Sequence, residues 1–266
     1  MANRSIVIRD GRKAPLFWVS PGIRQQDVIR QLGPDQPIIG LYPPEPAGNG
    51  PPPSFAEMAA YYVESICAVR RHGPYALTGW CAGGAASFEI ARQLRSRGEA
   101  VDALIMIDPL DLALSHAQGS RETAFFKVRF NFNRMLYHLH EVESRESGLA
   151  YCARCASLIG QRAKRAAAHR FHRLRFDSGW QLPARMLEID RPDDYAFRNY
   201  SPQPYAGSAT IIRPLMFKYA FEYPNRRWAQ VLQRGLEIRE VPGDYESMWH
   251  GPGAKAMSQV INSCLN

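Results

Sequence analysis

The sequence predicts an α/β fold in which a mostly parallel central sheet is flanked by helices on both faces. Short apolar runs bounded by turn residues recur along the chain, and such runs are typical of buried strands. Helical patterns lie between the later runs, and this alternation favours parallel strands joined by crossover helices. A length of 266 residues with 45% hydrophobic content suits one well-filled core, so we expect a single domain over residues 1–266.

The expected elements follow from these runs in chain order. Five strands are predicted in the first half, at Ser5–Ile8, Pro15–Val19, Pro37–Leu41, Tyr75–Gly79 and Ala103–Ile107. Helical patterns cover Phe55–Arg71 and Gly84–Ser96, and strand character returns at Ser208–Ile212 and Leu236–Val241 before a terminal helix at Pro252–Cys264. From about residue 112 to residue 187 the chain is rich in Arg, His, Ala and aromatic residues at helical spacing, which predicts an inserted helical lid.

The composition narrows the environment in which the protein works. No run approaches the roughly 18 apolar residues that a membrane helix requires, and the first residues lack the apolar core of a secretory signal. The five cysteines are an odd number scattered along the chain, which indicates reduced thiols in a cytoplasmic protein. Cys152 and Cys155 have the spacing of half a zinc site, but without a second pair we expect no metal and no cofactor of the protein's own. The start at Met1 with little linker favours a free-standing protein.

The segment from Tyr75 to Gly84 carries the strongest chemical signal. An apolar strand runs into Gly-Trp-Cys-Ala-Gly-Gly, and a helical pattern follows at once. This arrangement resembles the nucleophile elbow of the α/β-hydrolase fold, with Cys81 in place of the usual serine. The turn forces its central residue into a strained backbone conformation, and Gly79 and Gly83 provide room for the close approach of strand and helix. A structural cysteine beside a glycine-rich turn is the alternative interpretation.

The position of Cys81 also predicts how a reaction would be supported. At a helix N-terminus, unpaired amides and the helix dipole stabilise a thiolate. The backbone N–H of Ala82 would then face the oxyanion that forms when the thiolate attacks an acyl group. A second oxyanion donor is predicted at the backbone N–H of Gly22, in the turn after an early strand. These groups together predict nucleophilic acyl chemistry.

Further stretches extend a family likeness over nearly the whole chain outside the predicted lid. In chain order they are Pro15-Leu16-Phe17-Trp18-Val19, Gln36-Pro37-Ile38-Ile39-Gly40-Leu41, Ser54-Phe55-Ala56-Glu57-Met58-Ala59, Gly73-Pro74-Tyr75-Ala76-Leu77-Thr78-Gly79-Trp80, Ala91-Arg92-Gln93-Leu94, Tyr200-Ser201-Pro202-Gln203-Pro204-Tyr205-Ala206-Gly207 and Val241-Pro242-Gly243-Asp244. With the elbow, they make the chain resemble the thioesterase domains of nonribosomal peptide and polyketide synthases, in a cysteine-nucleophile variant. The resemblance implies an α/β-hydrolase fold and a substrate carried on the phosphopantetheine arm of a carrier protein.

The resemblance also implies the remaining catalytic residues. The acid of this family follows the strand after the nucleophile helix, a position that Asp108 occupies, with Asp111 as a competitor. The histidine of the family directly follows Gly-Asp, but here Tyr245 stands in that place. We therefore predict His250 as a displaced base, and its alternative role is to cap and solvate the terminal helix.

Cysteine in place of serine favours acyl transfer over hydrolysis. A thiol is already a few per cent thiolate near neutral pH, and an acyl-cysteine stays activated toward amines, thiols and alcohols. We predict an acyltransferase that takes an acyl, aminoacyl or peptidyl chain from a carrier-protein thioester onto Cys81 and passes it to a small-molecule or carrier-bound acceptor. The alternatives are a hydrolytic thioesterase and a degenerate, non-catalytic domain that binds carrier proteins.

The charge of the chain fits an acidic partner. The formal net charge is +8, and basic stretches at residues 162–165 and 169–175 of the predicted lid would steer an acidic carrier protein toward the site. A solvated helix face explains the same stretches equally well. No recognised nucleic-acid-binding motif accompanies them, so neither nucleic acid nor a membrane is an expected partner.

Overall fold

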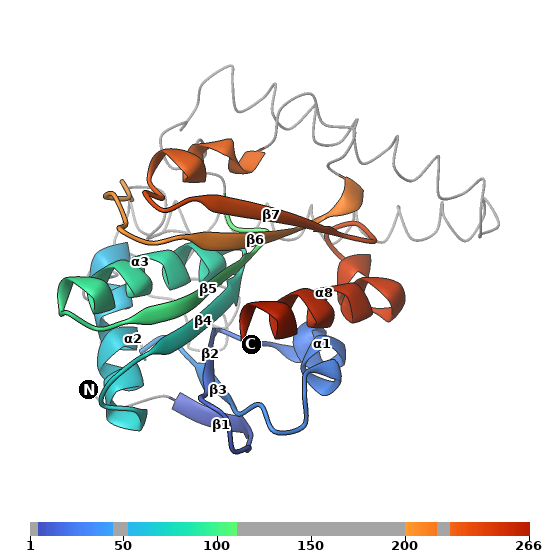
Figure 1. Ribbon diagram of the computed structural model, residues 1–266, viewed down its shortest axis with the longest axis horizontal. Coiled ribbons are helices and arrows are strands. Elements are labelled where there is room, and N and C mark those ends of the chain that lie inside the picture. The colour runs from blue at the N-terminus through green and yellow to red at the C-terminus, as the bar shows by residue number, and fades with distance from the viewer. Residues whose placement is uncertain (1–4, 45–52, 111–199, 217–223) are drawn as a thin grey trace, which may run out of the picture. The chain divides into compact units, whose positions relative to one another are not determined.

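The sheet that organises the protein is almost entirely parallel. The computed structural model describes residues 5–44, 53–110, 200–216 and 224–266, and within these ranges one sheet has the strand order β1-β3-β2-β4-β5-β6-β7 (Figure 1). β1 pairs antiparallel with β3, and every other neighbouring pair in this sheet is parallel. The strands are β1 (Ser5–Arg9), β2 (Leu16–Val19), β3 (Ile38–Leu41), β4 (Tyr75–Trp80), β5 (Val101–Ile107), β6 (Ala209–Pro214) and β7 (Leu236–Val241).

The predicted strands are confirmed in position, but the prediction that the first of them is buried was wrong. β1 lies at the edge of the sheet, where Ile6 is 55% exposed and Val7 is 63% exposed. An edge strand has a neighbour on one side only, and an apolar run of four residues does not reveal whether the strand it forms is central or at an edge. The four-residue strands β2 and β3, by contrast, are buried throughout.

Helices flank both faces of the sheet (Figure 1). The α-helices are α1 (Gln26–Gln31), α2 (Phe55–Val69), α3 (Ala82–Ser96) and α8 (Gly251–Cys264), and short 3-10 helices are η1 (Ile23–Gln25), η4 (Pro224–Gln230) and η5 (Ser247–Trp249). α2 and α3 pack with Phe17 and Leu77 in one apolar core, whereas α1 and α8 pack with Trp18 and Ile105 in a second. Phe17 and Trp18 are adjacent in β2, so the two cores lie on opposite faces of the sheet.

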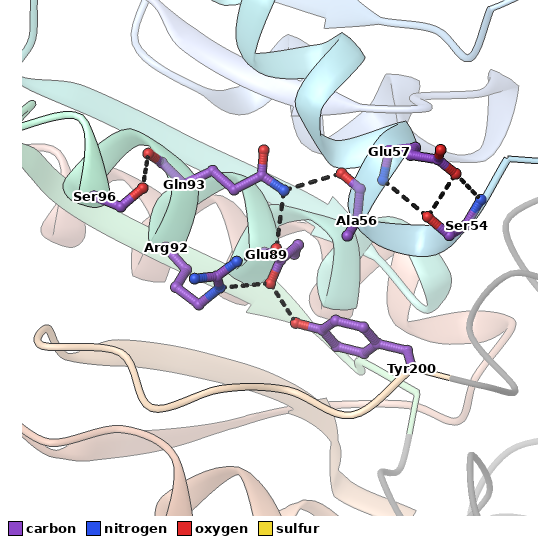
Figure 2. Close-up of polar contacts among 8 residues, drawn as sticks. All are labelled: Ser54, Ala56, Glu57, Glu89, Arg92, Gln93, Ser96 and Tyr200. Carbon is purple, nitrogen blue, oxygen red and sulfur yellow. Dashed lines mark hydrogen bonds and ion pairs between the residues drawn. The ribbon is translucent and has the colours of Figure 1, made fainter.

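Local sequence signals explain where the helices begin. At the start of α2, Ser54 Oγ accepts a hydrogen bond from the Glu57 N–H at 3.3 Å, and Glu57 Oε2 accepts one from the Ser54 N–H at 2.8 Å (Figure 2). This reciprocal capping box satisfies amides that have no partner within the helix. The helix predicted from Gly84 begins two residues earlier, at Ala82. Helix α1 was not predicted, because its six residues are too few to show a helical period.

Part of the predicted organisation lies outside the described residues. The helical lid expected at about 112–187 falls there, and so do the basic stretches assigned to it. Among the helices that are described, none has the length and apolar character needed to cross a membrane.

Candidate active site

Three strand ends at the carboxyl edge of the sheet adopt strained backbone conformations. Ser20 follows β2 with a φ of 48°, Cys81 follows β4 with a φ of 55°, and Asp108 follows β5 with a φ of 40°. Residues with a Cβ rarely adopt positive φ, and such strain of about 1–3 kcal/mol per residue persists mainly at functional sites. Ligands of open α/β sheets also bind at the carboxyl edge. This edge is therefore the candidate active site.

The turn around Cys81 has the close packing that an elbow requires. A Cβ on Gly79 would collide with the carbonyl oxygen of Gly83, and a Cβ on Gly83 would lie 2.9 Å from the carbonyl oxygen of Val19. A Cβ on Gly84 would lie 3.0 Å from the carbonyl oxygen of Gly79. The three glycines let β4, α3 and the end of β2 approach one another, and this approach holds Cys81 at the N-cap of α3.

The structure places Cys81 and Asp108 at neighbouring strand ends. β4 and β5 are paired in parallel up to Trp80 and Ile107, so Cys81 and Asp108 are the next residues in register. The Cys81 N–H donates to the Ile107 carbonyl at 3.0 Å, and the Leu110 N–H donates to the Cys81 carbonyl at 3.3 Å. Cys81 is partly buried and carries a thiol rather than a disulfide. The predicted nucleophile and the predicted acid therefore share one edge.

The carboxyl group of Asp108 lies in a poorly solvated environment. Burial raises its pKa to about 7, and the positive charge of Arg213 opposes this rise. Arg213 is 4% exposed on β6, and its Nη2 donates to Glu240 Oε1 of β7 at 2.5 Å. The backbone N–H of Asp108 donates to the carbonyl oxygen of Ile212, next to Arg213, at 2.7 Å. Near neutral pH, Asp108 is thus poised between its two protonation states.

The two predicted oxyanion donors differ in their surroundings. Ala82 is the first residue of α3, where amides have no acceptor within the helix. The Gly22 N–H, in contrast, donates to Gln25 Oε1 at 2.8 Å. The neighbouring Ser20 N–H donates to the carbonyl of Leu41 at 2.8 Å, so this loop has its amides engaged. The oxyanion role of Gly22 stays a prediction that requires Gln25 to turn aside.

Tyr245 contacts the residue that precedes the predicted nucleophile. Its ring packs on Trp80, the residue before Cys81, with ring centroids 4.8 Å apart. The turn that carries it is built by Asp244, whose Oδ1 accepts from the Ser247 N–H at 2.7 Å and from Ser247 Oγ at 2.6 Å. The residue at the position of the family's histidine therefore lies beside the elbow but has a phenol in place of an imidazole.

His250 is engaged elsewhere on the protein. It is the N-cap residue of α8, its side chain is 63% exposed, and its Nδ1 lies 2.7 Å from Oδ2 of Asp27 on α1. His250 thus stands at the start of the terminal helix, but its side chain makes no capping hydrogen bond to that helix. The role of base stays a prediction that requires the imidazole to leave Asp27. Asp111, the competitor of Asp108, lies outside the described residues.

Comparison with known proteins assigns this chain to a family. The family model described as the thioesterase domain matches residues 15–245, a range that contains the elbow, Asp108 and Tyr245. The chain belongs to the thioesterase domain family. The parallel sheet with flanking helices is accordingly the α/β-hydrolase fold of these domains, as predicted.

Similar proteins include parts of large synthases. The chain is 51% identical over 112 residues to N-(5-amino-5-carboxypentanoyl)-L-cysteinyl-D-valine synthase of Amycolatopsis lactamdurans, a match that covers 39% of the chain and 3% of the synthase. It is 32% identical over 131 residues to polyketide synthase PksR of Bacillus subtilis, a match that covers 46% of the chain and 5% of the synthase. The chain thus spans only a few per cent of the length of these relatives.

Solved structures of thioesterase domains have the same fold. The NocB thioesterase domain in covalent complex with a fluorophosphonate nocardicin G analogue superposes with a TM-score of 0.62 at 20% identity, covering 96% of both chains. The surfactin-cyclising thioesterase domain SrfTE superposes with a TM-score of 0.60 at 14% identity, covering 98% of this chain and 95% of its own. At these identities the likeness shows the fold alone.

Sequence reasoning missed a buried polar network on the helix that follows Cys81 in this thioesterase domain. Glu89 on α3 is 1% exposed, and its carboxylate accepts from Arg92 at 2.7 and 2.9 Å, from Gln93 at 2.9 Å and from the Tyr200 hydroxyl at 2.7 Å (Figure 2). Gln93 also donates to the Ala56 carbonyl at 3.0 Å. Burial raises the pKa of Glu89, but these hydrogen bonds outweigh burial and hold it below its ordinary value. The network joins α2 and α3 to Tyr200.

The described part of the thioesterase domain contains no candidate metal centre. Within these ranges, no group of three or more His, Cys, Asp or Glu side chains is arranged to hold a metal ion. The chemistry available at the described site is that of Cys81 and Asp108 with their backbone donors.

Proposed function

We propose that this thioesterase domain is an acyltransferase. It takes an acyl, aminoacyl or peptidyl chain from a carrier-protein thioester onto Cys81 and transfers it to an amine, thiol or hydroxyl acceptor. The observation that carries the proposal is the strained Cys81 at the N-terminus of α3, next in register to Asp108 at the carboxyl edge of the sheet. An accessible nucleophile on such a turn is the arrangement from which acyl-enzymes form.

Transfer is favoured over hydrolysis because the family's usual base position does not hold a histidine. Water is a poor nucleophile and needs a general base, whereas a thiol or a free amine attacks a thioester more readily. Tyr245 stands where the family pattern places that base, and His250 is bound to Asp27. An acyl group on Cys81 would therefore persist long enough to meet an acceptor.

The bond changes of the proposed reaction balance without a cofactor. Sγ of Cys81 attacks the carbonyl carbon of the carrier thioester, the oxyanion is stabilised by the Ala82 N–H, and the phosphopantetheine thiol leaves with the proton of the Cys81 thiol. The acceptor nitrogen, sulfur or oxygen then attacks the acyl-cysteine, and its proton returns to Sγ. Asp108 is the acid of the site, and His250 serves as base in the arrangement where it reaches Asp108.

An acidic carrier protein is the partner that fits this chemistry. The relatives include a peptide synthase and a polyketide synthase, and the intermediates of such synthases are held on carrier proteins. The net charge of +8 would draw an acidic carrier surface toward this chain and accelerate the encounter.

Product analysis tests the proposal. The protein is mixed with a carrier protein loaded with a radiolabelled acyl chain, with and without an amine acceptor, and the label is followed to amide or to free acid. We expect amide to form only with the acceptor and only with Cys81 present. Release of free acid at the same rate with and without acceptor would identify a hydrolytic thioesterase instead.

Two further variants locate the base. His250→Ala that abolishes transfer would support the displaced triad, whereas unchanged transfer would place the base elsewhere. Tyr245→Phe retains the ring that packs on Trp80 and removes only the hydroxyl, so it tests whether the phenol takes part. Carrier binding without any acyl transfer by the unaltered protein would contradict the proposal and favour a non-catalytic carrier-binding domain.

A further inference from the structure

Arg213 stands in an unusual position for a positive charge. It is 4% exposed near the end of β6, and an arginine is almost never buried without an anionic partner. The strand pairing of β6 with β7 places it opposite Glu240, which accepts its hydrogen bond at 2.5 Å. Glu240 itself keeps 31% of its side chain exposed, so the pair reaches from the solvent into the protein.

The buried Arg213 lies on the strand next to the one that carries Asp108. The pairing of β5 with β6 brings Ile107 level with Ile212, and the Asp108 N–H donates to the Ile212 carbonyl. Asp108 and Arg213, the next residues on the two strands, therefore lie at adjacent strand ends. Among the described residues, the charged or titratable groups around this edge include Cys81 after β4, Arg213 on β6 with Glu240 behind it, and Asp244 and Tyr245 after β7. The field of Arg213 acts on the Asp108 carboxyl against the effect of burial.

We propose that Arg213 is a positioning residue of this site, whose guanidinium, anchored by Glu240, favours the ionised form of the Asp108 carboxyl. Its catalytic consequence rests on the proposed function. An ionised Asp108 is required whether it stabilises a protonated His250 or itself accepts the proton of an incoming amine and returns it to Sγ of Cys81. With Tyr245 at the histidine position, Arg213 is the cation that acts on Asp108 among the described residues.

A titration of Asp108 tests this role without any substrate. The full chain is labelled with ¹³C at aspartate carboxyl groups, the Asp108 signal is assigned with Asp108→Asn, and its titration midpoint is measured by NMR. In Arg213→Met the midpoint should rise by about one pH unit or more, because removal of a nearby positive charge favours the neutral acid. Arg213→Lys keeps the charge and should keep the midpoint close to that of the unaltered protein.

A second substitution gives the opposite sign. In Glu240→Gln the negative charge behind Arg213 is removed, so the midpoint of Asp108 should fall. A merely structural disturbance would move both variants in the same direction, and this comparison remains available if Arg213→Met does not fold. Arg239→Met is the matched control, because Arg239 is 54% exposed and pairs with Glu237 on the same strand.

The outcomes separate this role from the proposed function. A rise in Arg213→Met with a fall in Glu240→Gln establishes the role, and the acidic limb of the pH profile for acylation of Cys81 should then move with the midpoint. A midpoint that stays within about 0.3 units in Arg213→Met, where the charge effect should reach at least about one, would overturn it. Absence of acyl transfer in the unaltered protein would contradict the proposed function alone, since the titration does not depend on it.

Discussion

Replacing Tyr200 by phenylalanine removes one hydroxyl group from the network around Glu89. The hydroxyl donates to Glu89 Oε2 at 2.7 Å, and the two residues are 7% and 1% exposed, so water has little access to replace it. The ring remains, and with it the packing on Phe55 at a centroid distance of 4.5 Å. Oε2 also keeps its hydrogen bond from Arg92 at 2.9 Å. The substitution therefore tests a single charge-assisted hydrogen bond.

The size of the effect follows from the charge of the acceptor. Hydrogen bonds to charged groups contribute about 1.5–3 kcal/mol, and the retained Arg92 contact limits the loss in Tyr200→Phe to about 2 kcal/mol. For a domain of this size that corresponds to a fall in Tm of about 4–8 °C. Urea unfolding followed by circular dichroism at pH 7 measures the change in the free energy of unfolding.

Tyr75→Phe is the matched control for this measurement. The Tyr75 hydroxyl donates at 3.0 Å to a neutral acceptor, the carbonyl oxygen of Arg70, so its removal should cost about 1 kcal/mol or less. If Tyr200→Phe destabilised the protein no more than Tyr75→Phe, the charge of Glu89 would not contribute as the structure indicates.

The remaining predictions concern the site. In Cys81→Ser, acylation by a carrier thioester should slow by about 10²-fold or more, because a hydroxyl needs the base that Tyr245 replaces; single-turnover rates near those of the unaltered protein would reveal a working base. Burial raises the pKa of Asp108 from an ordinary 3.8 to about 7 in the folded protein. The folded state therefore favours the protonated acid, and this contribution to stability is complete below about pH 4. It is lost as the pH rises from about 4 through 7, by up to about 4 kcal/mol in total. Asp108→Asn should remove this loss, and urea unfolding at pH 5 and pH 8 should show it; an unchanged pH dependence would contradict the assigned burial. Gln25→Ala frees the Gly22 N–H, and should destabilise the protein by about 1 kcal/mol without slowing acylation; a tenfold slower acylation measured by stopped-flow would exclude Gly22 as an oxyanion donor.

The sequence was sufficient for the elements whose signal is local. The elbow around Cys81 combines a strand, a glycine-rich turn and a helix within ten residues, and its geometry follows from that order. Asp108 could be placed because it ends the next strand, and adjacent parallel strands bring their carboxyl ends together. The edge position of β1 could not be predicted, since the same apolar run serves for either position.

Contacts between distant segments were beyond sequence reasoning. His250 meets Asp27 across 223 positions, on a helix too short to be predicted, and Tyr200 meets Glu89 across 111. The burial of Arg213 could not be predicted either, because one arginine after an apolar strand is ordinarily a surface residue. Only the order of the strands in the sheet showed that this arginine lies on the strand beside Asp108.

The central claim is that Cys81 carries the acyl group, and intact-protein mass spectrometry after a brief mixture with an acyl-loaded carrier protein tests it most directly. The chain offers a matched control in Cys67, a second partly buried thiol on α2. We predict a mass increase of one acyl group in the unaltered protein and in Cys67→Ala, and none in Cys81→Ala. An adduct that survives Cys81→Ala, or no adduct in the unaltered protein with any loaded carrier, would contradict the account.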